Sequence, residues 1–394
     1  KGAVMEMTFK GFNIRRFSTV LILILTLSAC SLSSEKKLAK HMQKGEGYLK
    51  AAKYKEAVIE FKNVVQIDPK NAKGHYNLGL AYLMLGDISY MKLAFQEFDK
   101  AVVSDPNLVD AQLKIGELYL LSRDFDKAIE KAGFILNRDK NNMDARILMA
   151  TSLAGKKEFG KAITMIEEML KANHDSIKPY MAAAGIYIAK NDQASAENTY
   201  KRAIAIKKDA IEPRIALASL YLRQGKTSDS EDELKKVIEI QPENPDIRLM
   251  LANVYFAAKR LNEAEKTYES VIALKPDNPN GYAILGEFYL ATSRVQDAHN
   301  TFKRGLEKKP DAVILEKKIA ELLLNEKKHK EAAVYIDAVL KKHPNDAYGF
   351  YLKGRLLLTE NKINEAIDNF KTSTKADPNI AYAHYYLGLA YQAS

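Results

Sequence analysis

Cysteine occurs only once in this sequence, at Cys30, so its thiol is the first side chain whose chemistry must be explained. A lone cysteine forms no intramolecular disulfide. Basic residues, among them Lys10 and Arg15, precede an apolar run over residues 17–29 that ends directly before the cysteine. This run is shorter than the roughly 20 residues that a membrane-spanning helix needs. A basic segment followed by such a run is typical of a secretory signal.

The four residues Leu27-Ser28-Ala29-Cys30 resemble the lipobox of bacterial lipoproteins. The resemblance implies that a signal peptidase cuts before Cys30 and that its thiol receives a thioether-linked lipid. Two or three acyl chains would then anchor the protein stably. Ser31 follows instead of aspartate, which in that family favours the outer membrane, facing the periplasm. The alternative is a plain signal or an uncleaved anchor in which the cysteine is incidental.

These features divide the chain into three parts. We expect a lipoprotein signal peptide at 1–29, the lipidated cysteine with a short polar tether at 30–37, and the folded body at 38–394. The first residue of the natural protein is expected at Met5 or Met7.

Catalytic and metal-binding motifs are not convincing in this sequence. Residues 155–161 read GKKEFGK and approximate a phosphate-binding loop, but Ala162 follows where serine or threonine must hold magnesium. We therefore expect a turn between helices there. The seven histidines form no HExxH or other close ligand set, and no G-x-S-x-G motif occurs. The sequence predicts a protein that is not an enzyme and has neither cofactor nor metal.

A 34-residue period organises the body. A residue expected to end a helix recurs after a first interval of 37 and then at eight intervals of 34, namely at Pro69, Pro106, Lys140, His174, Lys208, Pro242, Pro276, Pro310, Pro344 and Pro378. Proline lacks an amide hydrogen and stops a helix, and 34 residues is the length of one type of helix–turn–helix repeat. Positions 1–34 are counted within units that begin near residues 38, 72, 109, 143, 177, 211, 245, 279, 313, 347 and 381.

The residues inside each unit resemble the tetratricopeptide repeat (TPR) family. Positions 7, 8, 11, 20, 24, 27 and 32 of one unit are Leu285, Gly286, Tyr289, Ala298, Phe302, Gly305 and Pro310. Small residues at positions 8 and 20 let two helices approach, and aromatic residues fill the space between them. Ala132, Leu153 and Ser230 depart from the pattern. The resemblance implies an all-α, right-handed α-solenoid of about ten and a half repeats, which we expect to continue beyond Ser394.

In TPR arrays the first helix of each unit, helix A, lines a concave groove through positions 2, 5, 6, 9, 12 and 13. The lysines and asparagines by which chaperone-binding members hold a carboxylate are not matched. Position 5 is mostly apolar or aromatic, and position 9 is acidic at Glu46, Glu117, Glu287 and Glu321. This combination predicts a groove for a partner segment with apolar anchors and some positive charge.

The residues predicted to bind in the groove are Tyr76, Leu113, Met181, Leu249, Tyr348, Tyr351, Tyr382, Tyr385 and Tyr386. Two alternatives remain open at this stage. Position-5 side chains of the middle units pack within the solenoid instead of binding a partner, and the C-terminal tyrosines are exposed only because the chain continues.

The function predicted from these features is a lipid-anchored scaffold for protein–protein interactions in envelope assembly, secretion or exopolysaccharide export. Residues 78–142 also resemble the TPR lipoproteins of exosortase/PEP-CTERM systems. The alternative is the adaptor portion of a larger enzyme whose catalytic domain lies beyond residue 394. Of the net charge of +10, seven charges outside residues 1–29 are interpreted as spread over a large surface. Export argues against a nucleic-acid partner, and an acidic polysaccharide is the alternative ligand.

Overall fold

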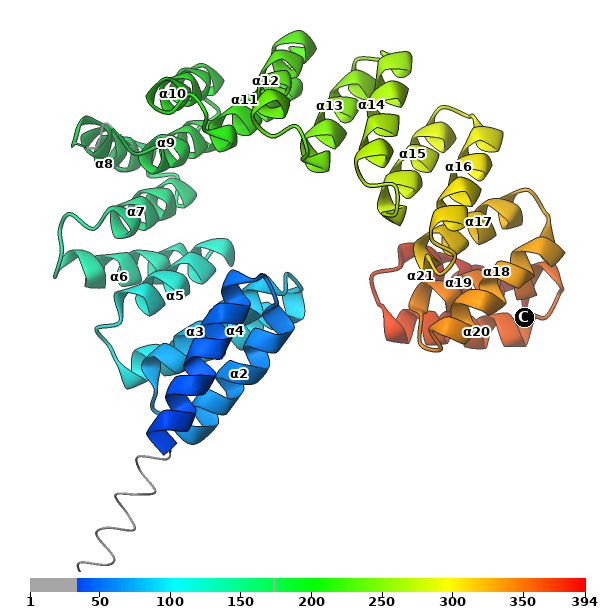
Figure 1. Cartoon of the computed structure of the whole chain (residues 1–394), viewed down its shortest axis with the longest axis horizontal. Helices are drawn as coiled ribbons and strands as arrows, with labels where there is room; N and C mark the ends of the chain where they lie inside the picture. Colours follow the sequence, from blue (N-terminus) through cyan, green and yellow to red (C-terminus); the bar gives the residue numbers. More distant parts are fainter. Residues whose placement is uncertain (1–33, 173–174) are drawn as a thin grey trace, which may run out of the picture. The chain divides into compact units, whose positions relative to one another are not determined.

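The computed structural model describes residues 34–172 and 175–394, which form helices joined by short turns, with no strand among them (Figure 1). They fall into two compact units, of which the first ends at Lys207 and the second runs from Lys208 to Ser394. The predicted signal peptide and Cys30 lie outside the described residues. None of the described helices is both long and apolar enough to cross a membrane.

The first unit begins with helical residues 34–50, so residues 34–37 of the predicted tether belong to a helix. Glutamate and lysine, which supply three of these four residues, are good helix formers. The helices that follow are α2 (Tyr54–Ile67), α3 (Ala72–Met84), α4 (Ile88–Ser104), α5 (Val109–Leu121), α6 (Phe125–Leu136), α7 (Met143–Gly155), α8 (Phe159–Ala172), α9 (Lys178–Ala189) and α10 (Gln193–Ile206).

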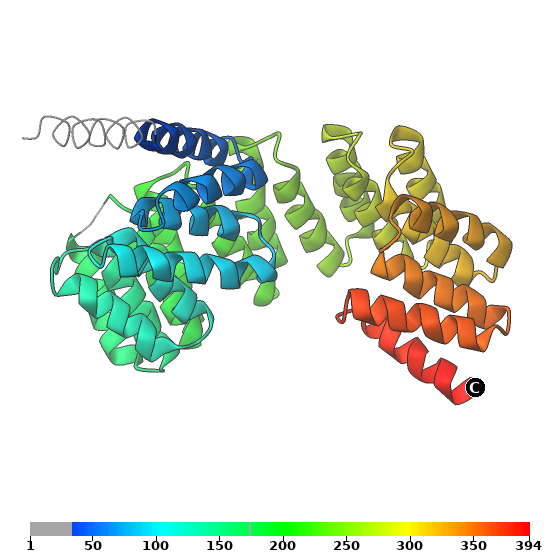
Figure 2. The same ribbon diagram turned by 90° about the horizontal axis from the view of Figure 1, so that it is seen from below.

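The second unit contains eleven helices in the order of the repeat (Figure 2). They are α11 (Ile211–Arg223), α12 (Thr227–Ile240), α13 (Pro245–Ala257), α14 (Leu261–Leu274), α15 (Pro279–Ala291), α16 (Val295–Lys308), α17 (Val313–Asn325), α18 (His329–Lys342), α19 (Ala347–Thr359), α20 (Ile363–Ala376) and α21 (Ala381–Ala393). The helix A starts predicted from the period agree with these bounds to within one or two residues.

The helices pack in the order that the repeat dictates. Helix A of a repeat packs against the second helix of the same repeat, helix B, as α15 does against α16. Helix B in turn packs against helix A of the next repeat. Successive A helices also touch, as α15, α17 and α19 do. In each of the two compact units, the A helices therefore form one layer and the B helices the other.

Local backbone chemistry sets where the helices begin and end. Asparagine or aspartate caps several A helices, and the Asn71 side chain accepts the amide of Gly74 at 2.8 Å. Position 15, in the turn between helices A and B, has a positive φ in all ten complete repeats. Only Gly86 and Gly225 are glycines there, and residues such as Lys259 (φ 60°) adopt this left-handed conformation although their Cβ disfavours it.

The core between the helices follows the predicted pattern of small and aromatic residues. Ala298 and Phe302 of α16 are fully buried, and the Phe302 ring lies directly against Gly286 of α15. A methyl group on Gly286 would come within 2.0 Å of that ring. Glycine at position 8 is therefore needed because the aromatic ring occupies the space of a side chain.

Candidate binding surface

The nine residues predicted to bind a partner differ widely in exposure. Tyr382 and Tyr385 of α21 are 65% and 61% exposed, whereas Leu113 and Tyr351 are buried at 8% and 2%. The remaining five are half-buried: Tyr76, Met181, Leu249, Tyr348 and Tyr386. Leu113 packs within the solenoid, as the alternative for position 5 describes. Tyr351, which was predicted among the C-terminal binding tyrosines, is buried as well, because rings of its own and the next helix A surround it.

The acidic residues at position 9 already have partners within the chain. Glu46 pairs with Lys73 at 2.9 Å, Glu117 with Lys114 at 2.6 Å, and Glu287 with Lys318. Glu321 accepts a hydrogen bond from the hydroxyl of Tyr348 at 2.9 Å and lies 3.8 Å from Arg355. Each of the four carboxylates predicted to flank the groove therefore has a partner within the chain.

Aromatic side chains of α19, α20 and α21 form one connected cluster. The ring of Tyr351 lies at its centre, 5.1 Å from Tyr348, 5.9 Å from Tyr386 and 6.5 Å from Tyr382. Phe370 of α20 stacks on Tyr386 at 6.0 Å. The predicted C-terminal tyrosines thus do come together, but Tyr351 supports its neighbours from within.

A pocket of about 220 Å³ opens beside this cluster. It is lined by Leu324, Arg355, Leu358, Thr359 and Tyr386. These residues come from α17, α19 and α21, and all stand at positions 6, 9, 12 or 13, which were predicted to face the groove. A mainly apolar wall with one guanidinium suits an apolar side chain whose neighbouring backbone carbonyl accepts a hydrogen bond.

Arg355 organises this pocket. Its guanidinium lies 5.1 Å from the centre of the Tyr386 ring and 5.7 Å from that of Tyr351. It also donates to the side-chain oxygen of Asn325 at 2.8 Å. Cation–π contacts on two rings fix the planar group in place. The sequence offered a signal for this residue, since Arg355 is basic at a position that is acidic in four other repeats.

Tyr348 and Tyr351 keep their protons at neutral pH. Burial raises the pKa of Tyr351 to about 12 against the opposing effect of Arg355. Burial, followed by the nearby Glu321 carboxylate, raises the pKa of Tyr348. The Tyr348 hydroxyl donates to Glu321, the Tyr351 hydroxyl accepts from Arg355 at 3.3 Å, and neither phenol is placed to act as a base.

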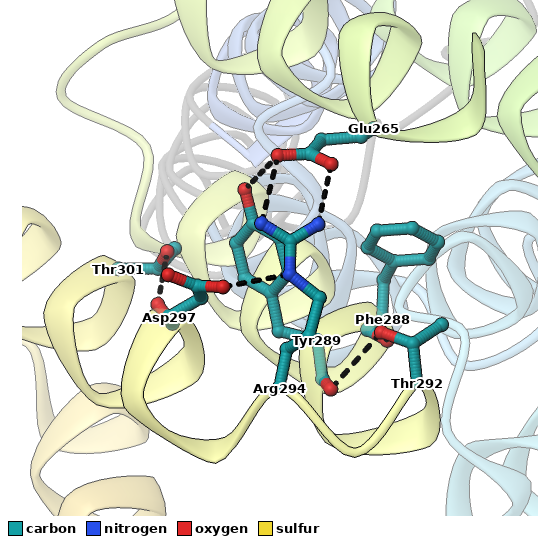
Figure 3. Close-up of polar contacts among 7 residues, drawn as sticks. All are labelled: Glu265, Phe288, Tyr289, Thr292, Arg294, Asp297 and Thr301. Atoms are coloured by element: carbon teal, nitrogen blue, oxygen red, sulfur yellow. Dashed lines mark hydrogen bonds and ion pairs between the residues drawn. The ribbon is translucent and has the colours of Figure 1, made fainter. Parts of the chain in front are cut away.

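A second polar site links α14, α15 and α16 (Figure 3). The Arg294 guanidinium contacts Glu265 at 2.6 and 3.3 Å and Asp297 at 2.6 Å, and it lies 4.4 Å from the centre of the Tyr289 ring. The Tyr289 hydroxyl donates to Glu265 at 2.8 Å. Arg294 lowers the pKa of the Glu265 carboxyl, and burial raises that of Tyr289. These opposite shifts fix one protonation state, which suits a structural staple and not acid–base catalysis.

The same staple occurs one repeat earlier. Glu231 accepts from the hydroxyl of Tyr255 at 2.9 Å and pairs with Arg260, which also pairs with Glu263. Burial opposes ionisation of Glu231, but hydrogen bonds from Lys235, Arg260 and Tyr255 outweigh it and lower the pKa to about 2. Each staple joins helix B of one repeat to both helices of the next.

A further recurring contact, not anticipated from the sequence, closes the junctions between repeats. The side chain at position 4 of helix A donates to the backbone carbonyl six residues earlier, at position 32 of the preceding repeat. The donors, at 2.9–3.1 Å, are His75, Gln112, Arg214, Arg248, Tyr282 and His384. Because these six residues share no single chemical type, the sequence alone gave little sign of a common role.

The GKKEFGK segment is a turn between helices, as predicted. Gly155 ends α7, Lys157 has a φ of 66°, and Ala162 of α8 is fully buried. Lys161 pairs with Glu158 at 2.6 Å. Within residues 34–172 and 175–394, no group of three histidine, cysteine or acidic side chains is arranged to hold a metal ion.

Family models match this chain in several places. A tetratricopeptide repeat model matches residues 231–288 and 258–322, and another matches 177–209 and 211–244. A TPR repeat model matches 45–86 and 354–394. Together with the 34-residue helix pairs, these matches decide the assignment. The chain is built of tetratricopeptide repeats.

Relatives and solved structures show how far the likeness extends. Hsp70-Hsp90 organizing protein 3 of Arabidopsis thaliana is 25% identical and organizing protein 1 of Glycine max 28%, each over 100 residues. Each match covers 25% of this chain and only 17% of the relative. Yeast Tom70 aligns over 91% of this chain and 88% of its own, at 16% identity and a TM-score of 0.44. TTC0263 of Thermus thermophilus aligns over 47% and 99%, at 20% identity and a TM-score of 0.41.

TPR proteins are generally non-catalytic scaffolds that bind proteins or peptides. For this chain, the face formed by the A helices is the surface on which such binding is expected. The lipid on Cys30, the outer-membrane location and the acidic polysaccharide ligand remain predictions from the sequence.

Proposed function

We propose that the chain is a lipid-anchored TPR scaffold on the periplasmic side of the bacterial outer membrane. It holds a segment of another protein against the A helices of its second unit, within an envelope assembly, secretion or exopolysaccharide/PEP-CTERM system. The lipobox at Cys30 supports the location. The pocket beside Arg355 supports the binding role, because its five lining residues all stand at groove positions of successive A helices.

The structure narrows the chemistry proposed for the partner. The position-9 carboxylates are paired within the chain. We therefore do not propose their attraction for a basic segment as the largest contribution to the binding free energy. Leu324, Leu358 and the ring of Tyr386 instead form an apolar surface that would remove an apolar side chain of the partner from water. A few such anchors usually carry most of the binding energy of an interface. The proposed partner segment therefore has an apolar or aromatic anchor that enters this pocket.

The binding proposal is tested by placing a charge in the pocket. Leu358→Glu should weaken capture of the partner co-purified from envelope extracts by about 2 kcal/mol or more, roughly thirtyfold, because a desolvated carboxylate opposes binding. Val334→Glu on α18, where the valine is 67% exposed, is the matched control. Circular dichroism verifies the fold of both variants. If Val334→Glu loses the partner and Leu358→Glu keeps it, the binding surface lies on the B helices.

The anchor is tested by Cys30→Ala. Labelled palmitate should enter the wild-type protein and not the variant, which should remain uncleaved or become soluble in the periplasm. Absence of label from the wild-type protein together with unchanged membrane fractionation would disprove lipidation.

A further inference from the structure

The positive charge of this protein is concentrated at one end and is not spread over the surface. Of the net charge of +10, residues 1–33 carry three and residues 34–55 carry five, which leaves two for residues 56–394. The segment 34–55 contains Lys36, Lys37, Lys40, Lys44, Lys50, Lys53 and Lys55 against Glu35 and Glu46. Residues 56–394 are thus nearly neutral in sum, whereas the segment 34–55 is strongly basic.

Most of these lysines lie on the outward side of helical residues 34–50. Leu38, Met42 and Leu49 pack on the core of the first unit, at the helical spacing that forms one face. Lys36, Lys40 and Lys44, each four residues apart, follow the opposite face, and all three are exposed. Gln43 and Lys37 border the same stripe. We call Lys36, Lys37, Lys40 and Lys44 the lysine face.

The lysine face differs from those lysines that form ion pairs within their own helix. Lys114, Lys201 and Lys235 pair with carboxylates of their own helices at 2.6–2.7 Å. Lys44 lies 4.0 Å from Glu60, which also binds His41 at 2.5 Å. Lys36, Lys37 and Lys40 have no ion-pair partner in the described parts of the chain. Their charges are therefore available to an outside anion.

We propose that the lysine face binds the anionic phospholipid headgroups of the membrane that holds the chain. The proposal rests on the lipid anchor of the proposed function. Lys36 stands six positions after Cys30, so the chain between their Cα atoms spans at most about 20 Å. Lys40 and Lys44 follow one and two helical turns further along. Basic side chains held this close to an anionic surface each strengthen binding by roughly fivefold. The lysine face would lay the first helix along the membrane instead of leaving it on a loose tether.

The test measures the accessibility of a thiol on the lysine face. Full-length protein carrying Gln43→Cys, purified in detergent, is reconstituted into vesicles of phosphatidylcholine, with or without phosphatidylglycerol. An uncharged, bulky maleimide should label the new thiol several-fold more slowly on the anionic vesicles. High salt should remove the difference, because salt screens the attraction. Asn300→Cys on α16 is the control thiol and should label at the same rate on both vesicles.

Charge variants complete the test. Lys36→Gln/Lys37→Gln/Lys40→Gln should abolish the protection, whereas Lys308→Gln/Lys309→Gln/Lys341→Gln, with the same change in net charge, should preserve it. Equal labelling of Gln43→Cys on the two vesicles would overturn the proposal, as would equal loss in both triple variants. The intact mass separately reports acyl chains on Cys30. If they are missing, the lipid anchor is wrong, and sedimentation of the wild-type protein and the two triple variants with the anionic vesicles then decides whether the lysine face binds headgroups.

Discussion

The two units of the chain are built from the same repeat but differ in how their cores connect. In the second unit, buried residues from Ala218 to Ala390 form one continuous cluster. In the first unit the buried residues fall into three clusters, centred on α2–α4, on α5–α7 and on α7–α9. A shared period therefore does not ensure that the buried side chains of successive repeats join into one core.

The first unit departs from the repeat pattern at several single positions. Every repeat that ends within the second unit after Lys208 has proline at position 32, whereas the first unit has Lys140 and His174 there. Ala132 and Ile166 replace the aromatic residue at position 24. Beside Ala132, Leu148 of the following repeat packs against Gly116 instead. Position 24 alone does not account for the separate clusters, because Leu234 and Ile336 are also non-aromatic there and belong to the continuous cluster of the second unit.

The largest loss of stability is expected when the buried side chain at position 24 is truncated to alanine in one repeat of each compact unit. Phe302→Ala should cost about 3–5 kcal/mol and Ile166→Ala about 2–5 kcal/mol, because both side chains are fully buried and leave cavities. Hydrogen exchange should increase through most of α11–α21 for Phe302→Ala. For Ile166→Ala it should increase only around α7–α10. An equally local response in both units would show that the continuous core does not couple the repeats.

Smaller changes in stability, opposite in sign to each other, are expected when alanine replaces two glycines that share position 8. Gly286→Ala should cost about 1–3 kcal/mol, because its methyl group meets the Phe302 ring. Nothing lies within 4 Å of the methyl group that Gly388→Ala adds to α21, so that change should stabilise by up to about 1 kcal/mol. Thermal unfolding measures both. Destabilisation by Gly388→Ala would mean that its surroundings are as closed as those of Gly286.

The smallest effect concerns the staples of the second unit in acid. The folded-state pKa of Glu231, about 2, lies below the ordinary value of 4.5. Its ionised form therefore stabilises the fold above pH 4.5, and this contribution is lost as the pH falls from 4.5 towards 2. Glu231→Gln should flatten the dependence of unfolding free energy on pH in that window. Exposed Glu239→Gln should not, and identical titration curves for the two variants would contradict the assignment.

The sequence predicted the repeat and its helices well because proline, alanine and glycine at fixed positions act locally. Ala298 and Phe302 were predicted to pack between the helices for this reason, and both are fully buried. Tyr351 was predicted as an accessible anchor, but contact between successive A helices encloses it. That enclosure depends on which side chains neighbour it in space, which one repeat read alone does not reveal.

Other structural features were harder to predict from the sequence. Arg355 gains its role only when the rings of Tyr351 and Tyr386 come beside it. The left-handed turn at position 15 went unnoticed because lysine, asparagine or serine occupies it more often than glycine. The division after Lys207 was also missed, since the 34-residue period runs through it unchanged.

The repeated staple has a consequence for how this gene can change length. Glu231, Tyr255 and Arg260 stand 34 residues before Glu265, Tyr289 and Arg294. Removing residues 245–278 would bring Glu231 opposite Tyr289 and Arg294, and the carbonyl of Pro242 would take the place of that of Pro276 as the acceptor for Tyr282. We expect such a chain to unfold cooperatively on heating, and a broad, non-cooperative transition would refute this. Unequal recombination within the gene could therefore add or delete one repeat without leaving a buried charge unmatched at the new junction.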